Sequence, residues 1–352
     1  MVKDYRDGNA QAFNGDLSGY ARAVERTAPR ADAKAAFEVF FNRFDPFLIC
    51  QWVFYLGVLL LVFAYWLTDT KPLKSAALAL LVATVVLHTA GLLARIYISG
   101  RPPVTNLYSS AVFIAWGAVL LCIGLEAIFR KGFGTLAAAV IGFASLQIAD
   151  ALAHRDADTM AQLQAVLDTN FWLATHVVCV TMGYMATYLA GLLAIIYIIR
   201  GVFSSSLTKE DSKDNARMAY GILCFAMLFS FVGTILGGIW ADQSWGRFWG
   251  WDPKENGAVL VVLWNALILH ARWGGVVKER GVMVLAVLGN IVTSWSFFGT
   301  NMLGIGLHSY GFMGKAFFYL TGWVILQIVL IIAGSFVNPG PSAPVLSASR
   351  EE

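Results

Sequence analysis

Long apolar runs separated by short polar segments make up most of the chain. A membrane-spanning helix needs about 20 mostly apolar residues, and nine runs without Asp, Glu, Lys or Arg approach or exceed that length. These runs are continuously apolar and do not alternate with polar residues, which favours helices over a transmembrane β-barrel. They cover 47–68, 75–94, 107–125, 132–149, 171–199, 218–240, 257–271, 281–307 and 316–337. We therefore predict an all-α, polytopic transmembrane helical bundle of about eight or nine spans, in which 257–271 is the shortest run.

The composition supports a membrane protein. Only 13% of the 352 residues are charged, whereas 58% are hydrophobic. An ordinary soluble domain carries about 25% charged residues, so the composition excludes a disordered or fibrous protein and argues strongly against a soluble one. The formal net charge of +3 gives no reason to expect nucleic acid as a partner. Membrane lipid is the partner that the composition predicts.

Basic residues are divided unequally between the two sets of loops. The richer set holds eleven Lys and Arg residues, namely Lys71, Lys74, Arg130, Lys131, Arg200, Lys209, Lys213, Arg217, Arg272, Lys278 and Arg280. The poorer set holds six, namely Arg95, Arg101, Arg155, Arg247, Lys254 and Lys315. Cytoplasmic loops carry the excess of Lys and Arg. We therefore predict that 150–170, 241–256 and 302–315 lie on the outer side of a bacterial cytoplasmic membrane.

Both ends of the chain are polar. Residues 1–46 contain seven basic and seven acidic residues and lack the pattern of a secretory signal peptide. Nine spans place this leader on the outer side, and one span fewer places it on the cytoplasmic side, so the pattern leaves both open. We predict three parts: a polar leader at 1–46 that forms a surface helix, a membrane domain at 47–337 and a polar tail at 338–352.

Tryptophan is concentrated in one predicted outer loop. Residues 240–256 contain four tryptophans and a phenylalanine. An interfacial aromatic belt explains single tryptophans at helix ends, but it does not explain so many in one loop. A flat apolar platform for a planar ligand explains the concentration better. We predict that Trp245, Trp249 and Trp251 form this platform.

A helix start follows the tryptophans. Asp252 is a good N-cap, Pro253 fits the first helical position and Glu255 completes a capping box. This start is predicted to hold the loop rigidly against the span 257–271. Arg247 and Lys254 are either solvated or paired with anionic groups.

The chain has only five histidines. An ionisable residue inside a span is energetically costly and is a functional candidate by default. His88 and His270 lie in predicted spans. Their alternative roles are a hydrogen bond to a neighbouring helix for His88 and an interfacial position for His270. His176 and His308 flank the tryptophan loop in the sequence and belong to the same outer face, whereas His154 is expected to be solvated.

Haem is the ligand that best fits this set of residues. Neutral imidazole binds haem iron, and two imidazoles fill both axial positions. Zinc or copper is the alternative, but no His or Cys pairs stand at short helical spacing with a carboxylate close by, as zinc would favour. We predict His176 and His308 as axial iron ligands beneath a cover of tryptophans.

Five separate segments then show a family resemblance. Residues 245–255 read Trp-Gly-Arg-Phe-Trp-Gly-Trp-Asp-Pro-Lys-Glu, which resembles the WWD motif of haem-handling proteins. The other segments are Pro103–Tyr108, Trp172–His176, Leu269–Arg272 and Gly306–Gly311. Together, over about 75–335, they resemble the system II cytochrome c biogenesis family called CcsA or ResC.

The resemblance implies a function. Its members export haem b as a transported substrate and present it for covalent attachment to the Cys-x-x-Cys-His segment of apocytochrome c, together with a partner of the ResB or CcsB type. It implies that His176 and His308 hold haem at the outer face, with the loop of Trp245, Trp249, Trp251 and Asp252 around it. His270 then binds haem in transit, and His88 is a weaker candidate. No residue resembles a nucleophile or a tuned general base, so the expected cytochrome c synthase (haem lyase) chemistry is haem presentation.

Three other functions remain open at this point. A system I haem-delivery protein shares the tryptophan motif. A membrane b-type cytochrome that exchanges electrons with quinone needs paired histidines at similar depth, which only His88 and His270 supply. A transporter for another small molecule is expected to show two corresponding halves with interrupted spans, and no such repeat is visible.

Overall fold

The computed structural model describes residues 1–68, 70–156, 159–160, 163, 165, 168–204, 207–306 and 314–340, with the side chains of Arg155, Asp156 and Lys315 excepted. Over these residues the chain is helical, and one isolated backbone bridge joins Thr208 to Gly340. The helices are α1 (Val2–Arg6), α2 (Ala10–Thr27), α3 (Pro29–Phe44), α4 (Pro46–Ile49), η1 (Cys50–Tyr55), α5 (Leu56–Thr68), α6 (Lys71–Ser99), α7 (Leu107–Phe129), α8 (Phe133–Asp156), α9 (Asn170–Trp172), η3 (Leu173–Val177), α10 (Val178–Phe203), α11 (Lys209–Trp245), α12 (Pro253–Trp273), α13 (Glu279–Ser294), η4 (Trp295–Gly299), η5 (Thr300–Met302) and α14 (Gly314–Ser335).

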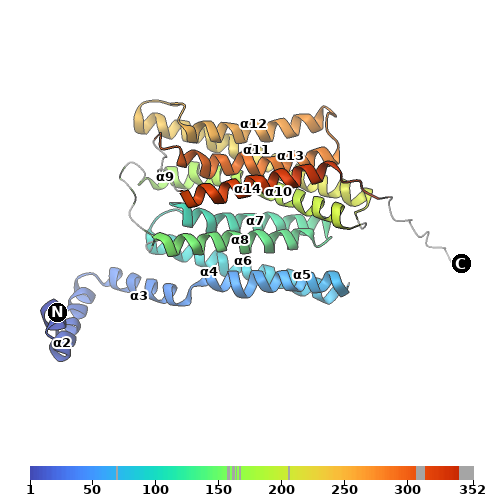
Figure 1. Ribbon diagram of the computed structural model, residues 1–352. Coiled ribbons are helices and arrows are strands. Elements are labelled where there is room, and N and C mark those ends of the chain that lie inside the picture. Colours follow the sequence, from blue (N-terminus) through green and yellow to red (C-terminus); the bar gives the residue numbers. More distant parts are fainter. Residues whose placement is uncertain are drawn as a thin grey trace.

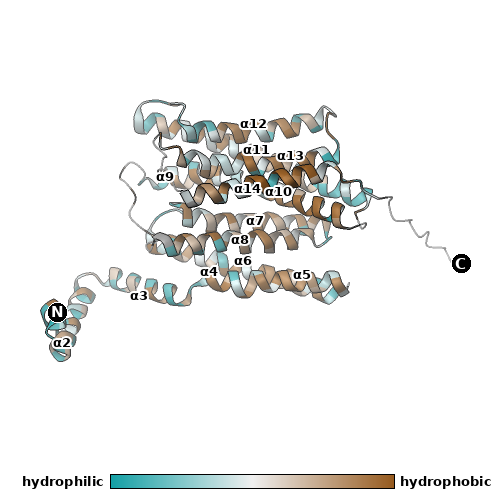
Figure 2. Ribbon diagram, viewed as in Figure 1, coloured by the Kyte–Doolittle hydropathy of each residue, from teal (hydrophilic) through white to brown (hydrophobic). Residues whose placement is uncertain are grey.

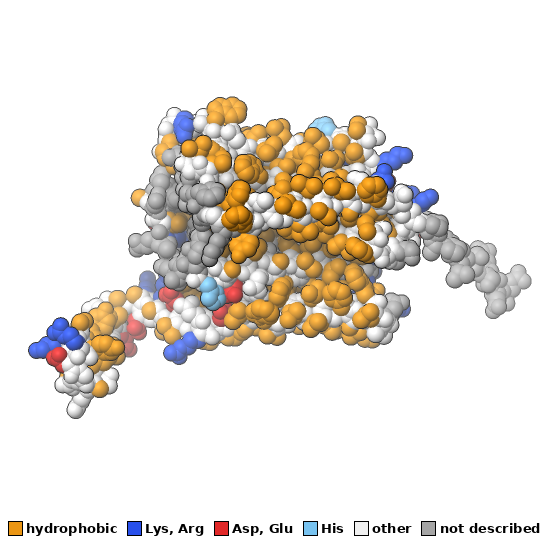
Figure 3. All heavy atoms as spheres, viewed as in Figure 1, with side chains coloured by type: hydrophobic (Ala, Val, Ile, Leu, Met, Phe, Trp, Pro, Cys, Tyr) orange, Lys and Arg blue, Asp and Glu red, His pale blue; other side chains and the backbone are white. Residues whose placement is uncertain are grey.

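The predicted polytopic helical bundle is confirmed. Eight helical segments among the described residues are long and apolar enough to cross a membrane. The ninth predicted run lies within α12, whose 21 residues extend about 32 Å at 1.5 Å per residue. Figure 1 shows α12 running parallel to the other long helices. Figure 2 shows hydrophobic residues along the helices and hydrophilic ones toward their ends, and Figure 3 shows orange side chains covering the middle of the visible face.

The loops that were predicted to share one side of the membrane lie at the same end of the bundle. The N-terminal helices and the loop between α11 and α12 lie at one end of the bundle, at the left of Figure 1. The turns that follow α7, α10 and α12, which belong to the set richer in Lys and Arg, lie at the opposite end. The tryptophan-rich loop is therefore at the end that is poorer in loop cations.

Glycine contacts bring α10 and α11 close together. A Cβ atom at Gly183 would lie 2.5 Å from the backbone nitrogen of Ser230, and one at Gly233 would lie 2.6 Å from that of Val180. Both contacts join antiparallel helices at points where no side chain separates the backbones. Small residues allow such close approach between membrane helices, so α10 and α11 form a tightly packed pair.

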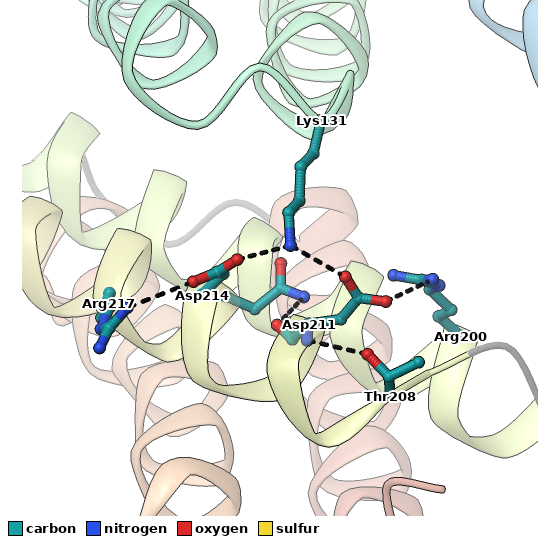
Figure 4. Close-up of polar contacts among 7 residues, drawn as sticks. Lys131, Arg200, Thr208, Asp211, Asp214 and Arg217 are labelled. Carbon is teal, nitrogen blue, oxygen red and sulfur yellow. Dashed lines mark hydrogen bonds and ion pairs between the residues drawn. The ribbon is translucent and has the colours of Figure 1, made fainter. Parts of the chain in front are cut away.

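Ion pairs fasten the end of the bundle that is remote from the tryptophan loop. Lys131, in the turn after α7, pairs with Asp211 and Asp214 in the first turns of α11. Arg200 near the end of α10 donates to Asp211 at 2.8 Å, and Arg217 lies 3.5 Å from Asp214 (Figure 4). Charge-assisted hydrogen bonds of this kind are stronger than neutral ones. The cluster therefore ties the α7–α8 turn to the pair formed by α10 and α11.

Candidate functional site

The tryptophan loop is held by its own backbone and by the start of α12. Gly246 ends α11 in the left-handed region at φ 69°, where glycine carries no steric penalty. The Asp252 carboxylate accepts a hydrogen bond from the backbone N–H of Lys254 at 2.8 Å. The Glu255 carboxylate accepts from the N–H groups of Gly250 and Asp252, at 2.8 and 3.1 Å. The predicted capping box is confirmed, and it ties the loop to α12.

His176 lies at the head of α10 within the π-helical turn η3. Its Nδ1 lies 2.7 Å from the carbonyl oxygen of Gly233 on α11. Because a carbonyl only accepts, Nδ1 carries the proton and Nε2 carries the lone pair of the neutral ring, the arrangement typical of metal-binding histidines. The half-buried ring packs edge to face on Trp240, with the centroids 5.7 Å apart. Its tautomer and orientation are thus both fixed by α11.

A cavity of about 240 Å³ opens beside His176. Helices α7, α10, α11 and α12, the tryptophan loop and η4 contribute to its wall. Its lining includes Leu107, Ser110, His176, Val180, Thr181, Tyr184, Gly237, Gly238, Trp240, Trp245, Arg247, Trp249, Lys254, Glu255, Ala258, Phe297 and Asn301. An aromatic wall with a few polar groups is the usual character of a small-molecule site.

Two of the three predicted platform tryptophans line this cavity. Trp245 and Trp249 face it. Trp251 does not line it: its side chain is 75% exposed and packs edge-on against Trp249, with the centroids 6.3 Å apart. Trp251 therefore supports the ring of Trp249 from outside the cavity. Asp252 is buried and acts through the cap, not through the cavity wall.

His88 does not reach this site. It is fully buried on α6, where its Nδ1 accepts from the Tyr55 hydroxyl and its Nε2 donates to the carbonyl of Val112, each at 3.1 Å. Both ring nitrogens are used by neighbouring helices, so the structure favours the structural alternative for His88.

His270 lies on an exposed face of α12. Its Nδ1 donates to the carbonyl of Ala266 at 2.7 Å, and its ring lies edge to face with Trp273, with the centroids 6.3 Å apart. In Figure 1, α12 and α6 lie on opposite sides of the bundle. His88 and His270 therefore cannot ligate one haem, which removes the paired histidines that a b-type cytochrome requires.

His308 lies outside the described residues. Gly306, the last residue described before that gap, has φ +87° and lies against the start of α12. A Cβ atom there would lie 2.0 Å from Oδ2 of Asp252 and 3.1 Å from Cδ of Pro253. The chain two residues before His308 is therefore in contact with the cap of the tryptophan loop.

Three residues of the site were not predicted from the sequence. Trp240 contacts His176, and its ring also stacks on Trp172 at 6.4 Å. Gly233 supplies the carbonyl for Nδ1, and Gly237 leaves space for the ring: a Cβ atom there would lie 2.6 Å from Cε1 of His176. The pair Gly233-x-x-x-Gly237 in an apolar run is a recognised signal of close helix packing. This spacing could therefore have identified Gly233 and Gly237 from the sequence alone.

Removal of the α12 cap should loosen the site. We expect Asp252→Ala to lower the stability of the start of α12 by about 1 kcal/mol, the usual contribution of a good N-cap. Asp252→Asn keeps a good N-cap and should retain most of this stability. Thermal unfolding in detergent measures the loss, and Trp fluorescence reports loop order. Equal unfolding temperatures for the alanine and asparagine variants would contradict this role.

This geometry defines a polytopic membrane protein with an aromatic, histidine-containing site at one end of its helical bundle. Residues 104–308 match the family model described as cytochrome c assembly protein, and the chain belongs to that family. The matched region contains the whole tryptophan loop and both flanking histidines.

Similar proteins agree with this assignment. The chain is 29% identical over 286 residues to the cytochrome c biogenesis protein CcsA of Synechococcus sp. strain CC9902, covering 73% of this chain and 94% of that protein. It is 30% identical over 315 residues to CcsA of Guillardia theta, covering 77% and 98%. Protein NrfI of Wolinella succinogenes is 31% identical over 80% of this chain, which spans about a third (32%) of NrfI. The resemblance inferred from the five sequence segments is confirmed.

A solved structure shares the fold. The cytochrome c haem lyase CcmF superposes with a TM-score of 0.60 at 17% sequence identity, covering 84% of this chain and 51% of CcmF. At this identity the likeness concerns the arrangement of helices. Family membership assigns the chain to cytochrome c biogenesis.

Proposed function

We propose that the chain is the haem-handling membrane subunit of a system II cytochrome c biogenesis machinery. It transports haem b to the outer face and presents it to the Cys-x-x-Cys-His segment of apocytochrome c. The observation that carries this proposal is His176, which is oriented by the Gly233 carbonyl and lies beside Trp240 in an aromatic cavity. A lone-pair nitrogen of fixed direction next to flat apolar rings suits a metal-containing planar ligand.

In this proposal haem is the substrate and the chain supplies its two axial ligands at the outer site. His176 is one ligand and His308 is the other. The contact between Gly306 and the α12 cap supports this pairing, because it brings the chain before His308 to the residues that immediately precede Lys254 and Glu255 of the cavity wall. Trp245 and Trp249 cover the macrocycle by apolar burial, which needs no directional bonds. Trp251 and Asp252 keep these rings in place.

The chemistry of attachment then depends on proximity and orientation. The apocytochrome histidine displaces one axial ligand, which brings the two cysteine thiols beside the vinyl groups of haem. Each S–H adds across one vinyl double bond: the sulfur bonds to one carbon, the proton goes to the other, and no electrons are exchanged. Holding the reacting groups in near-attack geometry supplies a large share of such a rate enhancement.

His270 is proposed as the ligand for haem in transit. Its side chain is exposed on α12, so it is directed toward whatever covers that face of the bundle, either lipid or a second protein. A histidine facing lipid alone is energetically costly. We therefore propose that a ResB-like or CcsB-like partner covers this face and supplies the second ligand. His88 is left out of this ligand set because both of its ring nitrogens are already used.

The orientation in the membrane follows from charge. The end of the bundle with fewer loop cations is placed outside, in agreement with the positive-inside rule. In a bacterium this is the periplasmic or outer side of the cytoplasmic membrane. It is also the side on which secreted apocytochrome c is available.

Co-expression tests the function directly. The full chain, a ResB-like partner and a c-type cytochrome reporter are produced together, and haem staining after denaturing electrophoresis scores covalent attachment. We expect staining that requires the chain and that is absent for a reporter with alanine in place of both cysteines. Abundant reporter without covalent haem, when both membrane proteins are present and folded, would overturn the proposal.

A further inference from the structure

Lys254 places an ammonium group in the wall of the cavity. It lies in the first turn of α12 and lines the cavity beside Glu255 and Phe297. Its Nζ donates to the carbonyl oxygens of Ser296 and Phe297, at 2.9 Å each, and lies 5.0 Å from the centroid of the Phe297 ring. These contacts fix the position of the charge.

The local backbone explains why these carbonyls accept a lysine. Residues Trp295–Gly299 form a π-helix, and Thr300–Met302 continue as a 3-10 helix. A change from i→i+5 to i→i+3 hydrogen bonding leaves carbonyl oxygens without regular helical partners. Gly257 lets α12 approach this point closely, since a Cβ atom there would lie 2.7 Å from Oγ of Ser296. The ammonium group of Lys254 is thus held in a fixed position next to the cavity by hydrogen bonds to these carbonyls.

The charge of Lys254 is not neutralised by an ion pair. Within the described part of the chain, no carboxylate oxygen lies within 4.0 Å of its Nζ. An ammonium has three donors, and two of them are used by the backbone carbonyls. The third is available for an acceptor, and a poorly solvated cation without a counter-ion is energetically unfavourable. A ligand that brings an anion to this position supplies what the protein lacks.

The surrounding charges favour an anion as well. The other charged side chains in the cavity wall are Arg247 and Glu255. The Glu255 carboxylate is engaged by two backbone N–H groups, and Asp252 accepts from the backbone N–H of Lys254. Two cations against one lining carboxylate leave a net positive wall. The N-terminus of α12 adds a partial positive charge at the same place.

We propose that Lys254 is a substrate-positioning residue that binds a carboxylate substituent of the planar substrate. This inference rests on the proposed function, in which the substrate is haem, whose propionate groups are its only carboxylates. The vinyl groups of haem lie on the edge of the macrocycle opposite the propionates. Anchoring a propionate at the wall formed by α12 and η4 therefore determines on which side of the cavity the vinyl groups meet the thiols.

Haem and its dimethyl ester test the proposal, because esterification removes the negative charge of both propionates and leaves the iron, the macrocycle and the vinyl groups unchanged. Binding of both ligands to the full chain in detergent is followed by absorption titration. We expect native protein to bind haem at least about tenfold more tightly than the ester, the lower range for a charge-assisted hydrogen bond. Lys254→Gln should remove this preference by weakening haem alone. Lys254→Arg keeps the charge and should retain part of the preference.

Lys278 provides a matched control. It is an exposed lysine at the N-cap of α13, at the opposite end of the bundle, and Lys278→Gln should leave both affinities unchanged. Equal affinity of native protein for haem and ester would overturn the anchor while leaving the proposed function intact. An equal fall in the affinities for haem and for the ester in Lys254→Gln would show that Lys254 has a structural role, and it would also overturn the proposed anchoring role. Failure of native protein to bind either ligand would contradict both the anchor and the proposed function.

Discussion

Replacing His176 by alanine is expected to abolish stable haem binding at the outer site. The imidazole is oriented by the Gly233 carbonyl and packed on Trp240, so its removal takes away the proposed iron ligand and leaves the groups that position it without a ring to hold. Loss of a hydrogen-bond partner behind a metal ligand already weakens metal binding by about 10–100-fold, and loss of the ligand itself should exceed this. Haem content after purification and the absorption spectrum of the reduced protein measure the effect.

Added imidazole distinguishes loss of the ligand from loss of the fold. It fits the space left by the side chain and should restore haem binding and reporter haem attachment in His176→Ala. The matched control is His154→Ala, because His154 is an exposed histidine whose side chain bonds to Asp150 on its own helix and does not line the cavity. Native haem content and an unchanged spectrum in His176→Ala would show that His176 is not an axial ligand. A parallel substitution at His308 tests the second ligand in the same way.

The architecture followed from local sequence properties. Continuous apolar runs predicted the helical bundle, since a backbone in lipid must satisfy its own hydrogen bonds. The distribution of Lys and Arg predicted which loops share an end of the bundle. The cap formed by Asp252 and Glu255 was predicted because it depends on residues three positions apart. In each case the information lies within one helix or one loop.

The site depended on contacts between distant segments. His88 and His176 both lie in apolar runs, yet one is closed off by Tyr55 and Val112 and the other opens on a cavity. These partners are 24 to 57 residues away in the sequence. Hydropathy contains no information about which helix packs against which, so it could not separate the two roles. Trp251, which lies outside the cavity, also has a positive φ of 57°, a backbone conformation that hydropathy does not predict for a tryptophan.

The π-helical turns were likewise not predictable from apolar patterning. His176 lies in one of them and the carbonyls that hold Lys254 lie in another. Such turns are rare and occur often at functional sites. In this chain they position His176 and Lys254, two of the polar groups that line the cavity. The aromatic and apolar residues provide the space, and these two turns provide its directional chemistry.

A single methyl group at Gly237 is expected to separate haem binding from folding. The Cβ atom of Gly237→Ala would lie 2.6 Å from Cε1 and 3.0 Å from Nδ1 of His176. Because the clash falls on a side-chain ring, the ring can move while the helices stay packed. Movement breaks the hydrogen bond from Nδ1 to Gly233, which sets the tautomer and the direction of Nε2. We expect haem affinity to fall about 10–100-fold, with little change in the unfolding temperature.

Two other glycines on α11 provide the comparison. Gly221→Ala meets nothing within 4 Å and should preserve haem binding, with a gain of about 0.5–1 kcal/mol from helix propensity. Gly233→Ala would place its Cβ atom 2.6 Å from the backbone nitrogen of Val180. Since backbone cannot move aside as a ring can, this variant should lower the unfolding temperature together with haem binding. Native haem affinity in Gly237→Ala would mean that the orientation imposed by α11 is not required. A joint loss of stability and binding in Gly237→Ala, equal to that of Gly233→Ala, would mean that Gly237 serves helix packing and not the histidine.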